Sequence, residues 1–193
     1  MKNNIFIYFT LFICCILSCS EENYYPKPTS YFRINLPEKS YKAIEEKCPF
    51  SFEIPIYSSL INKFNKSPDC HKTIKFTTLK AELICTYNEL DSNFYQLSEG
   101  LRKNVFEHSF KAKAIKEEEY INFDSHVYGT TFEVKGNVAL NYLFYLSDSN
   151  NHFFTGKLLF STRPNYDSLQ PVIDFIRLDI EHLIESFKWK NNR

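Results

Sequence analysis

The sequence contains very little glycine and no excess of charge of either sign. Only 4 of its 193 residues are glycine, so it has no glycine-rich loop of the kind that cradles phosphate groups. The 23 basic residues are balanced by 23 acidic residues, and this balance leaves no basic footprint for a nucleic acid. We therefore expect neither a phosphate-binding loop nor a nucleic-acid partner.

The motifs of metal binding and catalysis are also missing. The five histidines are scattered, and neither H-E-x-x-H nor C-x-x-C occurs. The most enzyme-like cluster is residues 147–152, where Ser, Asp and His coincide but no G-x-S-x-G turn frames a serine. We interpret this segment as a hairpin turn in which Asp148 and Asn150 bond backbone amides. A hydrolase that uses Asp148 and His152 is the rival hypothesis. We predict that the protein is not an enzyme and holds no cofactor or metal.

No apolar run is long enough to cross a bilayer. Residues 5–17 form an apolar stretch of 13 residues, whereas a membrane-spanning helix needs about 20. The stretch follows Lys2 and suits the hydrophobic region of a signal peptide. It ends at Ser18-Cys19, which resembles a bacterial lipoprotein box. We predict a signal peptide at residues 1–18 and fatty acylation of Cys19, which would hold the protein at a membrane. A plain secretory signal or a membrane-tethered segment is the alternative.

Export would place the cysteines in a compartment where disulfides form. Apart from Cys19, the mature chain has Cys48, Cys70 and Cys85. The first two lie beside turn-type residues, whereas Cys85 lies in an apolar strand-like run, where a free thiol is readily buried. We predict a disulfide between Cys48 and Cys70.

Aromatic residues are abundant, at 17% of the chain, and the residue pattern predicts antiparallel strands with two main helices. Residues 111–122 are ambiguous: a strand through Ala112, Ala114 and Ile115 is one interpretation, and residues 116–119 are expected to form a solvated turn. The last helix is expected to begin at Asp167 or Ser168, with Pro171 in its first turn. Strands are expected at residues 48–58, 73–78, 81–87, 127–134, 139–148 and 152–161, and helices at 93–107 and from about 168 to 187.

These elements indicate one α+β domain at residues 40–193, in which two main helices cover an antiparallel sheet. The order of strands and helices is similar to that of the PsbP/Mog1-like sandwich. Residues 19–39 contain Tyr-Pro-Lys-Pro and read as a lipidated tether and extended N-terminal arm.

A partner-binding surface is expected at one loop end of the sheet. Asp148 and His152 belong to the predicted hairpin turn, and Arg163 and Asn165 precede the last helix. We expect these four residues to lie at the same end of the domain.

Short motifs along nearly the whole mature chain resemble the gliding motility lipoprotein GldD family. The resemblance lies in their order and spacing: Tyr25-Pro26-Lys27-Pro28, Cys48-Pro49-Phe50, Asp148-Ser149, His152-Phe153, Asp167-Ser168-Leu169 and Glu185-Ser186-Phe187-Lys188-Trp189. It implies a non-enzymatic lipoprotein of the cell envelope, linked to gliding and to type IX protein secretion. The implied partners are envelope motility and secretion proteins. The implied location is the periplasmic leaflet of the outer membrane, in preference to the inner membrane or cell surface.

An envelope ligand-binding domain is the alternative function. The many Phe and Tyr residues could present exposed rings that hold a glycan or a lipid. A deep pocket lined by several of these rings would favour this alternative.

Overall fold

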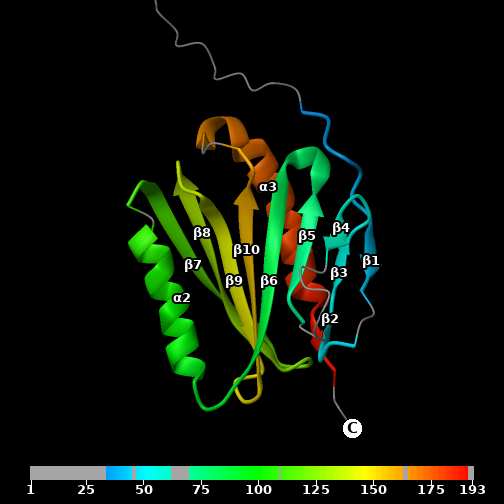
Figure 1. Cartoon of the computed structure of the whole chain (residues 1–193), viewed down its shortest axis with the longest axis vertical. Helices are drawn as coiled ribbons and strands as arrows, with labels where there is room; N and C mark the ends of the chain where they lie inside the picture. The colour runs from blue at the N-terminus through cyan, green and yellow to red at the C-terminus, as the bar shows by residue number, and fades with distance from the viewer. Residues whose placement is uncertain (1–33, 45–46, 62–69, 109, 163–164, 191–193) are drawn as a thin grey trace, which may run out of the picture. The chain divides into compact units, whose positions relative to one another are not determined.

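The computed structural model describes residues 34–44, 47–61, 70–108, 110–162 and 165–190, all within the compact unit Arg33–Arg193. Their main feature is a seven-stranded antiparallel sheet with the strand order β4-β5-β6-β10-β9-β8-β7 (Figure 1). Two helices accompany this sheet, which confirms the predicted α+β fold class. The signal segment, Cys19 and most of the arm lie outside the described residues.

The strands between residues 127 and 160 follow the sequence pattern closely. The helices are α2 (Phe94–His108) and α3 (Tyr166–Ser186). Among the described residues, neither helix combines the length and apolar character that a membrane crossing requires. The short 3-10 helix η1 (Thr77–Leu79) joins β5 to β6. The strands of the main sheet are β4 (Ser59–Ile61), β5 (Lys72–Phe76), β6 (Ala81–Glu89), β7 (Ala112–Asn122), β8 (Val127–Gly136), β9 (Leu140–Ser147) and β10 (His152–Phe160).

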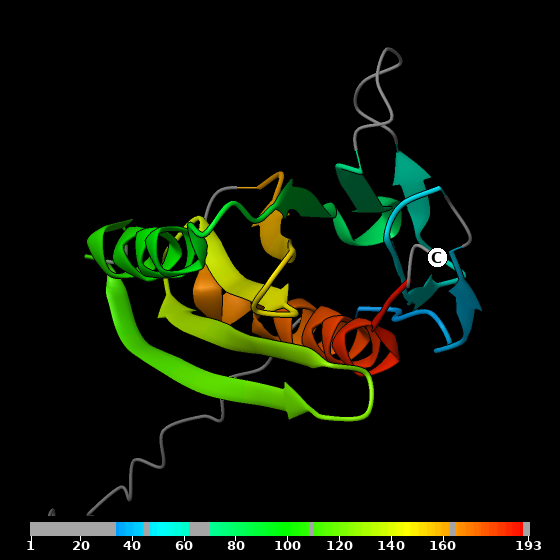
Figure 2. The ribbon, with the colours of Figure 1, turned by 90° about the horizontal axis from the view of Figure 1, so that it is seen from below.

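The two helices cover opposite faces of the sheet (Figure 2). Successive side chains of a strand point to opposite faces. On β9, Phe144 and Leu146 therefore join the core under α3, while Leu143 packs with Leu101 and Val105 of α2. Because both faces are covered, β9 reads as a nearly continuous apolar run.

A small strand layer packs beside α3. In it, β1 (Tyr41–Ala43) pairs with β3 (Glu53–Pro55), and β2 (Phe50–Ser51) pairs with β11 (Lys188–Trp189). The prediction of one continuous strand at residues 48–58 is therefore wrong, because β2 and β3 pair with different partners. The alternate side chains Phe50, Phe52 and Ile54 are buried, but Ile56 is 55% exposed.

The prediction of a solvated turn at residues 116–119 is wrong. These residues continue β7, an 11-residue strand at the edge of the sheet that pairs with β8. Charged side chains are compatible with an edge strand, where they hinder pairing with other chains. The run Lys116-Glu117-Glu118-Glu119 thus marks an exposed strand and not a break in one.

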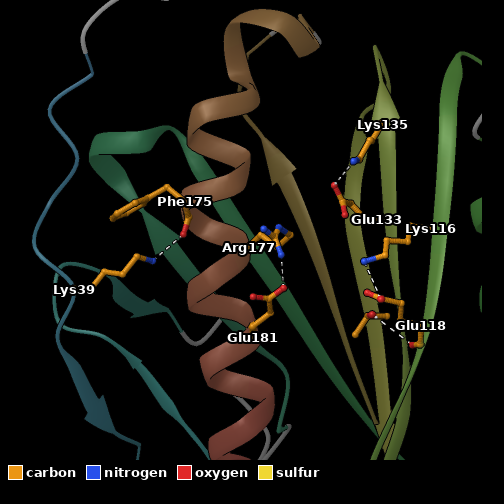
Figure 3. Close-up of polar contacts among 9 residues, drawn as sticks. Lys39, Lys116, Glu118, Glu133, Lys135, Phe175, Arg177 and Glu181 are labelled. Atoms are coloured by element: carbon orange, nitrogen blue, oxygen red, sulfur yellow. Dashed lines mark hydrogen bonds and ion pairs between the residues drawn. The ribbon is translucent and has the colours of Figure 1, made fainter.

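The start of the last helix also differs from the prediction. Helix α3 begins at Tyr166, and its capping position, Asn165, makes no side-chain capping bond. Instead Asn137, in the β8–β9 turn, accepts the Tyr166 N–H at 2.8 Å. Pro171 consequently lies in the second turn, where it has no N–H to donate to the carbonyl of Asp167. The first turn of α3 bends away from the rest of the helix (Figure 3).

The disulfide predicted between Cys48 and Cys70 is present, with the two Cα atoms 5.6 Å apart. It joins the chain just before β2 to the chain just before β5, and so fastens the small strand layer to the main sheet. In the chain-entropy model a loop of this length contributes about 3 kcal/mol. Cys85 is a free, buried thiol.

One buried carboxylate of α3 holds the first described segment of the chain against this helix. Asp179 is 1% exposed. Its Oδ1 accepts hydrogen bonds from Lys39 Nζ at 2.7 Å and Tyr41 Oη at 2.9 Å, and its Oδ2 accepts one from Tyr57. Lys39 Nζ also donates to the Phe175 carbonyl oxygen at 2.9 Å (Figure 3). We call these five residues the Asp179 clasp.

A second contact extends the clasp to β3. The ring of Tyr41 stacks on His182, with the ring centroids 3.6 Å apart. His182 Nε2 lies 2.7 Å from Glu53 Oε2. Residues of β1 and β3 are thereby joined to the same helix.

Replacing Asp179 should cost much more stability than replacing an exposed acidic residue of the same helix. Asp179→Asn removes the charge that three donors share, and breaking a buried pair in this way costs on the order of 3 kcal/mol. Glu181→Gln is the matched control, because Glu181 is 38% exposed and pairs with Arg177 on the surface; its loss should stay below about 1 kcal/mol. Denaturant unfolding measures both, and equal effects would contradict the role of the clasp.

Candidate functional site

A groove of about 1180 Å³ lies at the end of the sheet where two hairpin turns meet the C-terminal strand. We call it the end groove. Its walls come from the β7–β8 turn, the β9–β10 turn and β11. Most of its side chains are polar, and one tyrosine and one tryptophan are among them. The lining residues are Asn122, Asp124, Ser125, His126, Tyr128, Asp148, Ser149, Asn150, Asn151, His152, Lys188, Trp189 and Lys190.

Asp148 organises the β9–β10 turn. Its Oδ1 accepts the backbone N–H groups of Asn150, Asn151 and His152 at 3.1, 2.8 and 2.8 Å. Burial opposes ionisation of this carboxyl group, but the three N–H donors outweigh burial and lower the pKa of Asp148. The interpretation of Asp148 as a turn residue that bonds backbone amides is therefore confirmed.

The imidazole of His152 is held by residues other than Asp148. Its Nδ1 lies 2.7 Å from the Tyr87 hydroxyl, and its ring stacks on Trp189 with the centroids 5.0 Å apart. Tyr87 in turn donates its backbone N–H to His71 Nδ1 at 3.1 Å. Burial raises the pKa of Tyr87 to about 12, with Glu89 and Asp148 adding to the shift. The hydrolase hypothesis needs the Asp148 carboxylate against the His152 ring, whereas the structure joins them through the His152 backbone.

Two polar atoms in the groove walls are buried without a hydrogen-bond partner among the described residues. They are Ser125 Oγ and Trp189 Nε1. Trp189 packs edge-on against Phe187, with the ring centroids 4.7 Å apart. Buried polar groups nearly always have a partner in folded proteins, so these two atoms single out the end groove as a place for polar ligand contacts.

The structure brings together only part of the predicted partner surface. Asp148 and His152 line the end groove. Asn165 lies just beyond the opposite end of β10, whose nine residues extend about 30 Å, and Arg163 lies outside the described residues. The prediction that the turn and the loop before α3 share one end is wrong, because the intervening strand carries the chain across the sheet (Figure 1).

Sequence reasoning missed two of the three walls of the groove. The β7–β8 turn and β11 contribute, among others, Tyr128, Lys188 and Trp189. Trp189 is the only tryptophan in the sequence, and this was the one sequence feature that could have marked it as a candidate site residue. Its position beside His152 depends on the pairing of β11 with β2, which no local pattern indicates.

A second concave surface, of about 700 Å³, lies between α3 and strands β7 and β8. Its charged side chains largely neutralise one another: Lys116 pairs with Glu118 at 2.8 Å, and Lys135 with Glu133 at 3.5 Å (Figure 3). Leu36, from the end of the arm, lines the same surface. In the described part of the chain, no three His, Cys, Asp or Glu side chains gather closely enough to hold a metal ion.

Comparisons with known proteins identify a family and a similar solved structure. The family model for gliding motility lipoprotein GldD matches residues 21–189, which include all described residues except Lys190. None of the curated proteins matches the sequence. The solution structure of cyanobacterial PsbP (CyanoP) from Synechocystis sp. PCC 6803 is similar, with a TM-score of 0.46 and 12% identity over 81% of this chain and 96% of that chain.

The raised pKa of Tyr87 predicts how the free energy of unfolding falls at high pH. A phenol ionises near pH 10 in the unfolded chain and at about 12 in the folded protein at this position. Its contribution is therefore complete below pH 10 and is lost as the pH rises toward 12. Tyr87→Phe should make the decline in unfolding free energy between pH 10 and 12 shallower.

Denaturant unfolding at several alkaline pH values measures this slope. Tyr95→Phe is the control, because Tyr95 is 76% exposed and should leave the slope unchanged. Equal slopes in Tyr87→Phe and the wild type would contradict the prediction.

Proposed function

The chain belongs to the gliding motility lipoprotein GldD family, and from this membership we propose that it is a membrane-anchored, non-enzymatic accessory component of gliding motility and the linked type IX secretion machinery. The observation that carries the proposal is the match over residues 21–189. In this role the lipid keeps the protein at the envelope, and the folded domain contacts envelope proteins.

The anchor is proposed at Cys19. The apolar stretch at residues 5–17 and the Ser18-Cys19 pair support it. From Cys19 to Lys39 the chain has 20 residues and can reach at most about 70 Å, so the domain stays near the membrane, with the periplasmic leaflet of the outer membrane favoured. The Asp179 clasp then attaches the end of this tether to α3.

A binding role, and not catalysis, suits the chemistry of the end groove. The Asp148 carboxylate already accepts three backbone N–H groups, and the His152 ring is engaged by Tyr87 and Trp189. Side chains bonded in this way hold the walls of the groove in position. We therefore assign Asp148 and His152 to the shaping of the groove.

An envelope ligand-binding domain is the second candidate function. The cores on both faces of the sheet are filled by side chains, so the interfaces between the sheet and its helices give this function no support. The end groove supports it, because Tyr128 and Trp189 lie there among many side chains that can form hydrogen bonds. This candidate is compatible with the accessory role.

Replacement of the lipidated cysteine tests the anchor. Cys19→Ala should abolish incorporation of labelled palmitate and move the protein from the membrane fraction to the soluble fraction. Cys15→Ala is the matched control from the same segment, and it should keep both label and location. A Cys19→Ala protein that still carries the label and sediments with membranes would contradict the anchor.

Cross-linking in intact cells tests the accessory role. A C-terminally tagged wild-type protein, cross-linked before lysis, should co-purify with envelope motility or secretion proteins. The tagged Cys19→Ala protein should recover about tenfold less of the same proteins, because tethering raises the local concentration. A wild-type protein recovered without such partners would count against the proposed role.

A further inference from the structure

We infer that the end groove binds an acidic glycan of the cell envelope. This inference goes beyond the accessory role and does not depend on the tether, because it concerns only the folded domain. It rests on the side chains that face the groove, on the rigidity of its walls and on its position relative to the entry of the chain.

The hydrogen-bonding inventory of the groove suits sugar hydroxyl and amide groups. The side-chain amides of Asn150 and Asn151 line the groove, and both residues are exposed. Each amide offers two donors and one acceptor oxygen. His126 adds an exposed imidazole, and Ser125 Oγ lies buried without a partner among the described residues. Such a mixture of donors and acceptors matches a polyhydroxylated ligand better than an acyl chain.

Aromatic rings supply the apolar part of sugar recognition. Tyr128 lines the groove, and its ring meets the edge of Phe123, which is 73% exposed, at a centroid distance of 6.2 Å. Trp189 is held against His152 by ring stacking. Rigid aromatic side chains give contact area at a low cost in conformational entropy. The C–H faces of a pyranose ring can pack on such surfaces.

The walls of the groove are fixed before any ligand arrives. The Asp148 turn is closed by three backbone N–H groups. On the other side, Lys190 donates its backbone N–H to the Pro49 carbonyl oxygen at 2.8 Å, and Pro49 follows the disulfide-bonded Cys48. A preformed site lowers the ordering cost of binding.

One lysine of the groove is available to an acidic ligand. Lys188 is exposed and lines the groove, and no ion pair joins it to another described residue. Two carboxylates, Asp124 and Asp148, line the groove as well, and that of Asp148 accepts three backbone N–H groups. A carboxylate on a sugar ring would therefore find Lys188 available for a charge-assisted hydrogen bond.

The end groove lies far from the place where the first described residues meet α3. Leu36 lies beside Gln170 and Pro171, near the start of α3. Lys188 and Trp189 follow the end of this helix, whose 21 residues extend about 30 Å. The end groove and the first described segment of the chain therefore lie near opposite ends of α3.

Binding can be measured on the full-length lipoprotein in detergent, with Trp189 as a built-in probe because it is the only tryptophan. The soluble probe is the disaccharide of N-acetylglucosamine and N-acetylmuramic acid, and the insoluble probe is purified peptidoglycan. We expect the disaccharide to change Trp189 fluorescence and the protein to co-sediment with peptidoglycan. The neutral N-acetylglucosamine disaccharide should bind about tenfold more weakly, since it lacks the carboxylate.

Two variants locate the site. Lys188→Glu and Tyr128→Ala should each weaken disaccharide binding by about tenfold or more, with the unfolding midpoint checked for each. The matched control is Lys103→Glu on the outer face of α2, where Lys103 is 73% exposed, and it should bind like the wild type.

Several results would overturn the inference. These are the absence of both a fluorescence change and co-sedimentation up to about 10 mM sugar, an equal loss in Lys103→Glu, or a response to phospholipid vesicles and not to sugar. A cross-link from the groove to a protein, without sugar binding, would also overturn it. A negative result leaves the membrane and cross-linking tests of the accessory role unaffected.

Discussion

The buried carboxylate of Asp179 is the group on which the arrangement of this protein depends. An isolated charge in the interior is strongly unfavourable, so it must be paired and hydrogen-bonded. Its partners Lys39, Tyr41 and Tyr57 all come from the first part of the domain, up to 140 residues away in sequence. Burying Asp179 therefore requires that the entering chain lie against α3, and the clasp links the tether to the last helix.

Helix α3 connects the two ends of the domain. The entering chain passes near its start, and β11 follows its end. β11 pairs with β2, which the Cys48–Cys70 disulfide connects to the main sheet. One helix thus carries both the attachment of the first described segment, through Lys39 and Tyr41, and the position of Trp189.

The sequence predicted most of the sheet because burial on both faces leaves a clear apolar pattern, as on β9. The disulfide and the Asp148 turn were also predictable, since each depends on local residue chemistry. Of the edge strand β7, only the start at residues 112–115 was indicated, because the charges at 116–119 resemble a solvated turn. Asp179 lies within the apolar stripe of α3, next to Ile180, and this signal could have marked it. Its partners, and the place of Trp189, depend on tertiary pairing that no local pattern encodes.

Hydrogen exchange of the full-length lipoprotein tests most directly whether the clasp fixes the tether to α3. Amides of β1 exchange slowly only if this strand stays attached. If the clasp holds β1 against α3, the amides of Tyr41–Ala43 should be protected together with those around Asp179. Exchange of β1 at the rate of an unstructured chain, while the centre of α3 remains protected, would contradict it.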